Sequence, residues 1–162
     1  TSMLACATPS YLATRGRPHH PTDLQNFDRL AFSRATTAGV WSFTDRVGHV
    51  HKVSGTVRLL ADNMDMLLYA ALAGAGIVYG PAFIFADYLR SNQLEQVLGD
   101  YTTESLDIHA VYPSSLLVPA KLRRLIGFLS NWFIQNAAWE VTDKVQILPD
   151  ARQDEENFRE GI

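Results

Sequence analysis

The sequence predicts an α/β fold with an open sheet, because residues 57–89 alternate between strand-like and helical patterns. A β-prone run over residues 57–60 is followed by an apolar stripe with helical spacing, formed by Met64, Leu67, Leu68, Ala71 and Leu72. A second β-prone run at residues 77–79 leads into Gly80 and Pro81, which predict a turn with Pro81 at the first position of another helix. Open α/β sheets bind ligands outside the carboxyl ends of their strands, so a ligand site is expected there.

The boundaries of the first of these helices carry their own signals. Asp62 and Asn63 are both favourable N-cap residues, and Asp65 adds an acidic group to the first turn. Gly74 and Gly76 can supply the left-handed residue that ends the helix. The N–H groups at the helix start favour a polar or anionic ligand. The alternative interpretation is that Asn63 is only a cap, which is worth about 1 kcal/mol.

Turn and periodicity signals place the remaining elements. Strands are expected over residues 3–7, 29–32 and 108–112, with a hairpin turn around residues 44–48 and a possible strand at 141–148. Pro9 opens a short helix over residues 10–14, and Thr22 or Asp23 caps a helical turn through Asn26. Pro119 opens the longest helix, whose apolar face is expected to lie on a sheet; that face consists of Leu122, Leu125, Ile126, Leu129, Trp132 and Phe133.

Length and charge bound the class of protein. The chain has 162 residues, enough for one domain with a core, and 14 basic against 17 acidic residues give a net charge of −3. The segment 150–162 holds five acids and two arginines, so it accounts for that charge. A nucleic-acid-binding domain normally shows a basic face, and the densest cluster here is only Lys121, Arg123 and Arg124. No direct nucleic-acid contact is therefore expected from this chain.

The sequence also favours a location inside the cell. No apolar run reaches the roughly 18 residues that a membrane helix needs, and the first residues lack the pattern of a signal peptide. The single cysteine, Cys6, lies in an apolar run, which is typical of a buried, unreactive thiol in a reducing compartment. We therefore expect a cytoplasmic protein with no membrane contact.

Enzymatic and metal-binding interpretations find little support in the sequence. His19 and His20 are adjacent and His49 and His51 are two apart, but neither pair has a third ligand at metal spacing. The segment 74–76 (Gly-Ala-Gly) follows a helix and precedes a strand, the reverse of the order in a dinucleotide-binding loop. No G-x-S-x-G nucleophile motif occurs. We therefore expect neither an enzyme nor a cofactor or metal site.

Three blocks of the chain resemble one known family. They are ACATPSYLATRGRPHHPTDLQNFDRLAF at residues 5–32, AALAGAGIVYGPAFIFADYLRSNQLEQVL at 70–98 and HAVYPSSLLVPAKLRRLIGFLSNWF at 109–133. In this order they are similar to the effector-binding domain of LysR-type transcriptional regulators, chiefly its second subdomain. The resemblance runs from about residue 4 to 133, which is most of the chain.

The resemblance implies a periplasmic-binding-protein-like (type II) effector domain, with one complete lobe and part of the other. Residues 9–105 would form the second lobe, while 1–8 and 106–138 would supply the crossover strands and part of the first lobe. Residues 139–162 would be a C-terminal extension, partly disordered because their composition is acidic and poor in apolar residues. The family's helix-turn-helix has no counterpart here. An incomplete first lobe leaves an unpaired sheet edge, so a homo-oligomer is expected.

The implied function is sensing of a small-molecule effector, with transcription controlled through an attached DNA-binding domain that this chain lacks. The alternative is a solute-binding protein of similar fold that captures a small polar ligand for transport. The effector is expected to be a small carboxylate or aromatic molecule, although Asp62 would weaken attraction for an acid. Six residues are expected to bind it at the strand ends, namely Ser33, Asp62, Asn63, Met64, Gly80 and Pro81.

Overall fold

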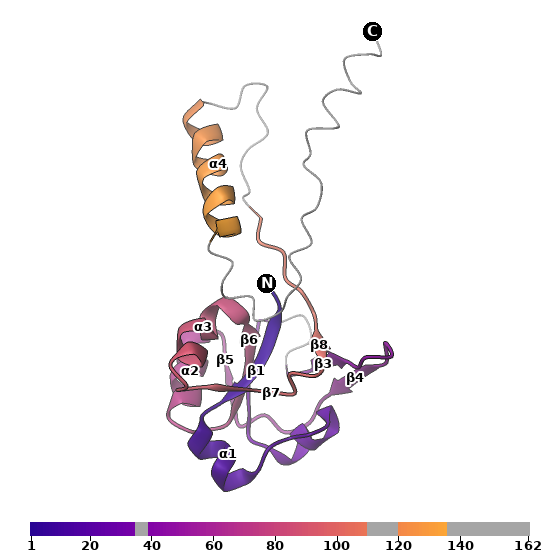
Figure 1. Ribbon diagram of the computed structural model, residues 1–162. Helices are drawn as coiled ribbons and strands as arrows, with labels where there is room; N and C mark the ends of the chain where they lie inside the picture. Colours follow the sequence, from indigo (N-terminus) through magenta and orange to yellow (C-terminus); the bar gives the residue numbers. More distant parts are fainter. Residues whose placement is uncertain (35–38, 110–119, 136–162) are drawn as a thin grey trace.

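The computed structural model describes residues 1–34, 39–109 and 120–135, and two sheets form its body (Figure 1). The larger sheet has five strands in the order β5-β2-β6-β1-β7. Its strands are β1 (Met3–Ala7), β2 (Arg29–Phe32), β5 (Leu59–Ala61), β6 (Ile77–Pro81) and β7 (Glu95–Val97). The expected strands at residues 3–7 and 29–32 are confirmed, and the α/β class is confirmed with them.

Strand direction places three strand ends at one edge of this sheet. β2 runs parallel to both β5 and β6, with Phe32 opposite Ala61 and Leu30 opposite Val78. β1 runs antiparallel to β6 and to β7. The carboxyl ends of β5, β2 and β6 therefore meet, which is the place where an open α/β sheet binds its ligand.

The second sheet is a hairpin with one added strand. β3 (Trp41–Thr44) and β4 (Val50–Val53) pair antiparallel with Phe43 opposite His51, as the expected turn at 44–48 requires. The short strand β8 (Thr102–Thr103) pairs with β3. The hairpin lies on the side of the large sheet away from α2 and α3 (Figure 1).

Successive side chains along each strand point to opposite faces of the large sheet, and both faces are buried. On β1, Leu4 and Cys6 face one core layer while Ala5 and Ala7 face the other. The first layer also contains side chains of α2 and α3, and the second contains the hairpin and α1. Burial raises the pKa of the Cys6 thiol far above its ordinary value, so the thiol stays protonated.

Five helices complete the described structure. They are α1 (Pro9–Arg15), the 3₁₀ helix η1 (Pro21–Asn26), α2 (Met64–Leu72), α3 (Ala82–Arg90) and α4 (Ala120–Gln135). None of those described is long and apolar enough to cross a membrane. The Asn63 side chain caps α2 as expected, and Gly74 at φ 75° supplies the left-handed residue after it. Gly76 serves a different purpose, because the Asp28 backbone occupies the space where a Cβ would lie.

Two expected helix starts are wrong. η1 is capped by His20, not by Thr22 or Asp23, and Asp23 completes a capping box as the N3 residue. Pro81 is not the first helical residue but the last residue of β6 and the N-cap of α3. Pairing of Pro81 with Met3 extends the strand through the expected Gly80–Pro81 turn.

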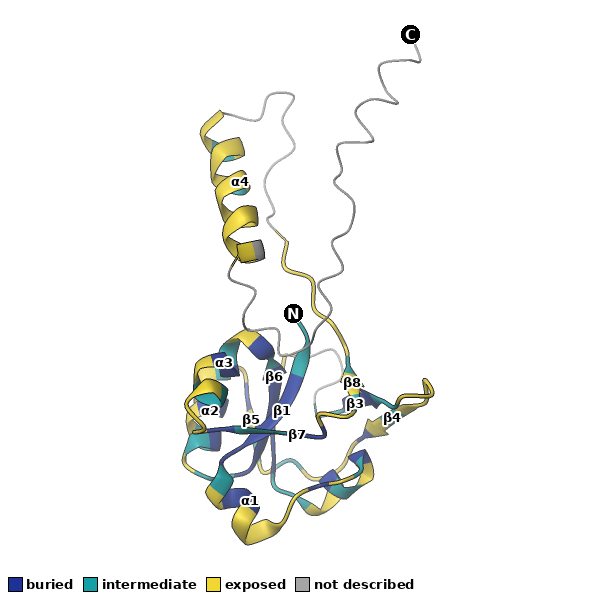
Figure 2. Cartoon of the chain, in the orientation of Figure 1, coloured by how far each residue is buried: buried dark blue, intermediate teal, exposed yellow. Residues whose placement is uncertain are grey.

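The region after residue 105 differs from expectation. Residues 106–109 form no strand, although Ser105 makes a bridge with Ser2, and the remainder of the strand expected at 108–112 lies outside the described residues. Pro119, residues 136–138, the expected strand at 141–148 and the extension 139–162 also lie outside them. In the described structure no sheet covers the expected apolar face of α4, because Leu125 is 52% exposed and Trp132 44% (Figure 2).

Candidate functional site

The carboxyl edge of the large sheet brings together the chain segments that carry the six predicted residues. The Ser33 N–H donates to the Ala61 carbonyl oxygen at 2.8 Å, which holds the segment after β2 against the end of β5. Asp62 and Asn63 follow Ala61 directly and are exposed. Pro81 ends the neighbouring β6 and is half-buried.

Asn63 combines a structural bond with a free polar group. Its Oδ1 accepts from the backbone N–H of Asp65 at 2.8 Å and of Met66 at 3.2 Å, which is an N-cap. The side-chain amide nitrogen of Asn63 and the N–H of Met64 have no hydrogen-bond partner in the described part of the chain. Two donors therefore remain at the start of α2, where the helix dipole favours an anion.

Gly80 lies behind the other predicted residues. It is buried in β6 opposite Leu4, and the methyl group of Met64 occupies the space where a Cβ would lie. Gly80 therefore lies beneath the side chain of Met64 at this edge of the sheet. The role of Gly80 in binding stays a prediction.

The structure adds Arg34 to the edge, a residue that the sequence interpretation missed. Its Nη2 lies 3.3 Å from Asp62 Oδ2, and both side chains are exposed. The expected repulsion between Asp62 and an acidic effector is therefore offset by an adjacent cation. Arg34 follows Ser33 directly, but the two partners are 28 positions apart, so local spacing gave no signal for the pair.

Ser2 is a second residue that the sequence interpretation missed. The Ala82 N–H donates to the Ser2 carbonyl oxygen at 2.9 Å, so Ser2 lies beside the end of β6. Its Oγ is buried and has no hydrogen-bond partner among the described residues. Nothing in the sequence around Ser2 indicates this position, because it results from the pairing of β1 with β6.

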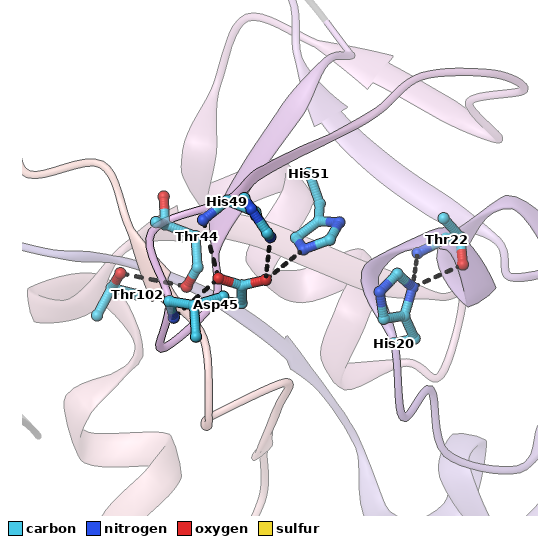
Figure 3. A network of polar contacts seen from close by, with 8 residues as sticks. His20, Thr22, Thr44, Asp45, His49, His51 and Thr102 are labelled. Carbon is cyan, nitrogen blue, oxygen red and sulfur yellow. Dashed lines mark hydrogen bonds and ion pairs between the residues drawn. The ribbon is translucent and has the colours of Figure 1, made fainter.

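His20, His49 and His51 lie around the turn of the β3–β4 hairpin (Figure 3). Asp45 accepts from the N–H of Val47 at 3.0 Å and of His49 at 2.8 Å, and its Oδ2 lies 3.2 Å from His51 Nε2. The rings of His20 and His51 meet edge to face with 4.8 Å between their centres. Within the described ranges no three or more of His, Cys, Asp or Glu could hold a metal. The arrangement fastens the hairpin turn.

Electrostatics at Asp45 follow from these contacts. Burial raises its pKa, but the hydrogen bonds from the His49 N–H, the His51 ring and the Val47 N–H outweigh burial, so the pKa is below its ordinary value.

A hollow of about 340 Å³ adjoins this turn, lined by His19, Asp45, Arg46, Val47, Asp100 and Tyr101. None of the six predicted residues lines it.

Comparison with known proteins is informative over most of the chain. The family model described as LysR substrate binding domain matches residues 1–133. The HTH-type transcriptional regulator DmlR of Escherichia coli (strain K12) is 31% identical over 135 residues, which cover 82% of this chain and 43% of the relative. The transcriptional activator TtdR of the same strain is 33% identical over 131 residues, covering 80% and 41%. The chain thus spans less than half the length of these curated relatives.

Solved structures agree with the fold. The CrgA regulatory domain of Neisseria meningitidis, a LysR-type transcriptional regulator, superposes with a TM-score of 0.66 at 27% identity, covering 80% of this chain and 64% of that one. The regulatory domain of AphB from Vibrio vulnificus gives 0.69 at 21% identity, covering 81% and 64%, which supports the fold alone. These matches bear out the periplasmic-binding-protein-like architecture.

Proposed function

The chain belongs to the LysR substrate-binding domain family, the effector-binding regulatory domains of LysR-type transcriptional regulators, and on this basis we propose that it senses a small anionic molecule at the carboxyl edge of β5, β2 and β6. Its relatives are transcriptional regulators, not enzymes. They also favour a regulator over the alternative of a solute-binding protein for transport.

The observation that supports this site is a group of hydrogen-bond donors at one edge of the sheet. The Arg34 guanidinium, the Asn63 side-chain amide and the Met64 N–H all lie where segments leave parallel strands. Guanidinium groups bind carboxylates through charge-assisted hydrogen bonds, and a helix start adds favourable dipoles. We therefore propose a small carboxylate, aromatic or aliphatic, contacted by Ser33, Arg34, Asn63 and Met64, with Pro81 as an apolar wall.

In our proposal, the effector signals by shifting the equilibrium between two arrangements of the lobes. Within this proposal, residues 9–105 form the second lobe, and residues 1–8 and 106–138 supply the crossover strands and part of the first lobe. An effector bound between the lobes stabilises the arrangement that it binds more tightly. The gain in free energy equals the difference between its binding free energies for the two arrangements. The attached DNA-binding domain of the full-length regulator would read that arrangement, as a homo-oligomer and in the cytoplasm, where the DNA is.

Asn63→Asp in the full-length regulator tests the site. A thermal-shift screen of small carboxylates and aromatic acids first supplies the effector. Aspartate keeps the capping oxygen, so stability should barely change, whereas the added charge should weaken binding of an acid about tenfold or more. The control is Asn26→Asp, the same change on an exposed residue of η1, before β2 begins.

The outcomes separate the two interpretations of Asn63. Weaker effector binding with unchanged unfolding supports the site. If the effector response of Asn63→Asp equals that of Asn26→Asp, Asn63 is only a cap and the site lies elsewhere.

A further inference from the structure

An exposed ion pair lies within the proposed effector site. Arg34 follows the end of β2 by two positions and Asp62 follows the end of β5 by one, and these strands run side by side with Phe32 opposite Ala61. The Arg34 side chain is 73% exposed and the Asp62 side chain 63% exposed. The ends of two parallel strands therefore hold opposite charges next to each other on the surface.

This pair contributes little to the stability of the fold. Its separation of 3.3 Å exceeds the roughly 2.7–2.9 Å of a strong charge-assisted hydrogen bond. Ion pairs that are this exposed stabilise a protein only weakly, because water screens them and ordering the side chains costs entropy. A ligand can therefore separate the two charges at little cost to the fold.

Both partners keep unused hydrogen-bonding capacity. A guanidinium carries five N–H donors, and a carboxylate accepts at both oxygens. Among the described residues, Arg34 Nη2 and Asp62 Oδ2 make contact only with each other. Arg34 Nε and Nη1 and Asp62 Oδ1 are left for a ligand, beside the donors of Asn63 and Met64. The edge thus offers donors for a carboxylate and an acceptor for a cation.

The side-chain charges of this edge are not balanced. Besides Arg34 and Asp62, the described part of the edge carries Asp65, which is exposed in the first turn of α2. One cation and two anions leave one negative charge in excess. An effector whose only charge is a carboxylate is repelled by this excess, whereas a carboxylate that also carries a cation is not.

We propose that the effector is an α-amino acid, whose ammonium binds Asp62 and whose carboxylate binds Arg34 and the start of α2. This inference rests on the proposed function for the location of the site. The ammonium and carboxylate of an α-amino acid are joined through one carbon atom, so its charges lie side by side as those of Arg34 and Asp62 do. Each charge of the ligand then meets an opposite charge of the protein.

A hydroxyl group in place of the ammonium is the neutral alternative. A hydroxyl can also donate to Asp62 Oδ1, but it brings no charge and leaves the negative excess of the edge in place. Hydrogen bonds between two charged groups are stronger than those of a neutral donor. The 2-hydroxy acid is therefore expected to bind more weakly than the amino acid.

Ligands that differ only in this group test the proposal. An aromatic series consists of 3-phenylpropionate, 3-phenyllactate and phenylalanine, and an aliphatic series consists of 4-methylpentanoate, its 2-hydroxy derivative and leucine. Isothermal titration calorimetry with the full-length regulator measures each affinity. In at least one series the amino acid is expected to bind about threefold to tenfold more tightly than the acid without an amino group.

Asp62→Asn is expected to invert this preference. The ammonium loses its charged partner, so the amino acid should bind about threefold to tenfold more weakly than it binds to the wild type. The acid without an amino group meets less repulsion and no longer competes for Arg34, so it should bind more tightly. Because the two ligands respond with opposite signs, a general disturbance of the site cannot produce this result.

Asp65→Asn is the matched control, because it removes the same charge from a second exposed acid of the same edge. The ion pair between Arg34 and Asp62 stays intact in this variant. The preference for the amino acid should therefore persist. If Asp65→Asn and Asp62→Asn changed the preference equally, Asp62 would not be the group that binds the ammonium, and the proposal would be wrong.

The proposal is also overturned if neither amino acid binds more tightly than the matching acid without an amino group, or if the hydroxy acid binds as tightly as the amino acid. Asn63→Asp, measured with the acids that lack an amino group, tests the location of the site separately. If Asn63→Asp weakens their binding while the amino acids have no advantage, the site is right and the class of effector is wrong. An amino-acid preference that Asp62→Asn inverts, with no effect of Asn63→Asp, gives the reverse conclusion for Asn63.

Discussion

Met64 and Gly80 are in direct contact where α2 begins against β6. The terminal methyl group of Met64 occupies the position of a Cβ at residue 80, and Phe85 Cζ would lie 3.0 Å from that Cβ. Glycine at this position lets the first turn of α2 approach the sheet closely. The donors of Asn63 and Met64 are held at the strand edge as a result.

Gly80→Ala is expected to lower the free energy of unfolding by about 1–3 kcal/mol, because Met64 and Phe85 must both move to admit a methyl group. Urea unfolding followed by circular dichroism measures this change. Gly127→Ala in α4 is the control, because no atom of the described residues lies within 4 Å of where its Cβ would be. There helix propensity predicts no loss, and a gain of up to about 1 kcal/mol. Equal stability of the two variants would contradict the tight contact.

Leu125→Lys is expected to reduce self-association of the chain. Leu125 is 52% exposed on α4, and exposed apolar surface favours contact with a second copy. Sedimentation velocity over a range of concentrations should show a smaller associated fraction in the variant. Ser130→Lys adds the same charge to an exposed position on the same helix and should leave association unchanged. If the wild type remained monomeric at every concentration, the proposed homo-oligomer would be wrong.

Acid is expected to loosen the hairpin through Asp45. Because the pKa of Asp45 is lower in the folded state, its contribution to stability is present above its unfolded pKa of about 3.9 and is lost as pH falls through the folded value. Amide signals of β4 in an NMR titration from pH 6 to about 2 should broaden or shift in the acid range. Asp45→Asn keeps an acceptor for the turn N–H groups and should flatten this dependence.

Asp87→Asn is the control for the acid titration. Asp87 is exposed and contacts Arg90 within α3, so its replacement should leave the response of β4 unchanged. Asp23 also has a lowered pKa, from the N–H groups of His20 and His19, and adds a loss of the same sign in η1. A β4 response that persists in Asp45→Asn would assign the effect to Asp23 instead.

Local signals account for the elements that the sequence predicted well. β2 is a four-residue run, and α2 begins directly after Asn63, whose side chain accepts from the N–H groups of Asp65 and Met66 in the first turn. Pro81 misled the prediction because its local preference for a helix start competes with pairing to Met3, 78 positions earlier. Local preference and long-range pairing conflict there, and pairing decides.

The polar contacts of Arg29 and Arg34 could not be predicted because the groups that these side chains bind are distant in sequence. An arginine at the start of a strand is typical of an exposed end, yet Arg29 bonds to carbonyls 10 to 27 positions away. Arg34 and Asp62 likewise meet across 28 positions. That three strand ends meet at one edge was predictable from the alternation of strands and helices, whereas the placement of Arg34 beside Asp62 was not.

Asp62→Asn is expected to strengthen binding of a small carboxylate while barely changing stability. In the wild type, Asp62 competes with the effector for Arg34. An exposed ion pair contributes about 0–1 kcal/mol, so its loss should lower the free energy of unfolding by no more than that. Removing one nearby negative charge should tighten binding about threefold to tenfold, measured by isothermal titration calorimetry with the acid found in the thermal-shift screen.

Asp100→Asn is the matched control, because Asp100 also forms an exposed ion pair, with Arg46 at 2.7 Å beside the hairpin. Arg34→Gln should have the opposite effect to Asp62→Asn and weaken binding. The gain in Asp62→Asn should also shrink as salt rises, since exposed charges are screened within about 10 Å at 0.1 M. If Asp62→Asn and Asp100→Asn changed the affinity equally, long-range charge alone would explain the effect, and Arg34 would not contact the effector.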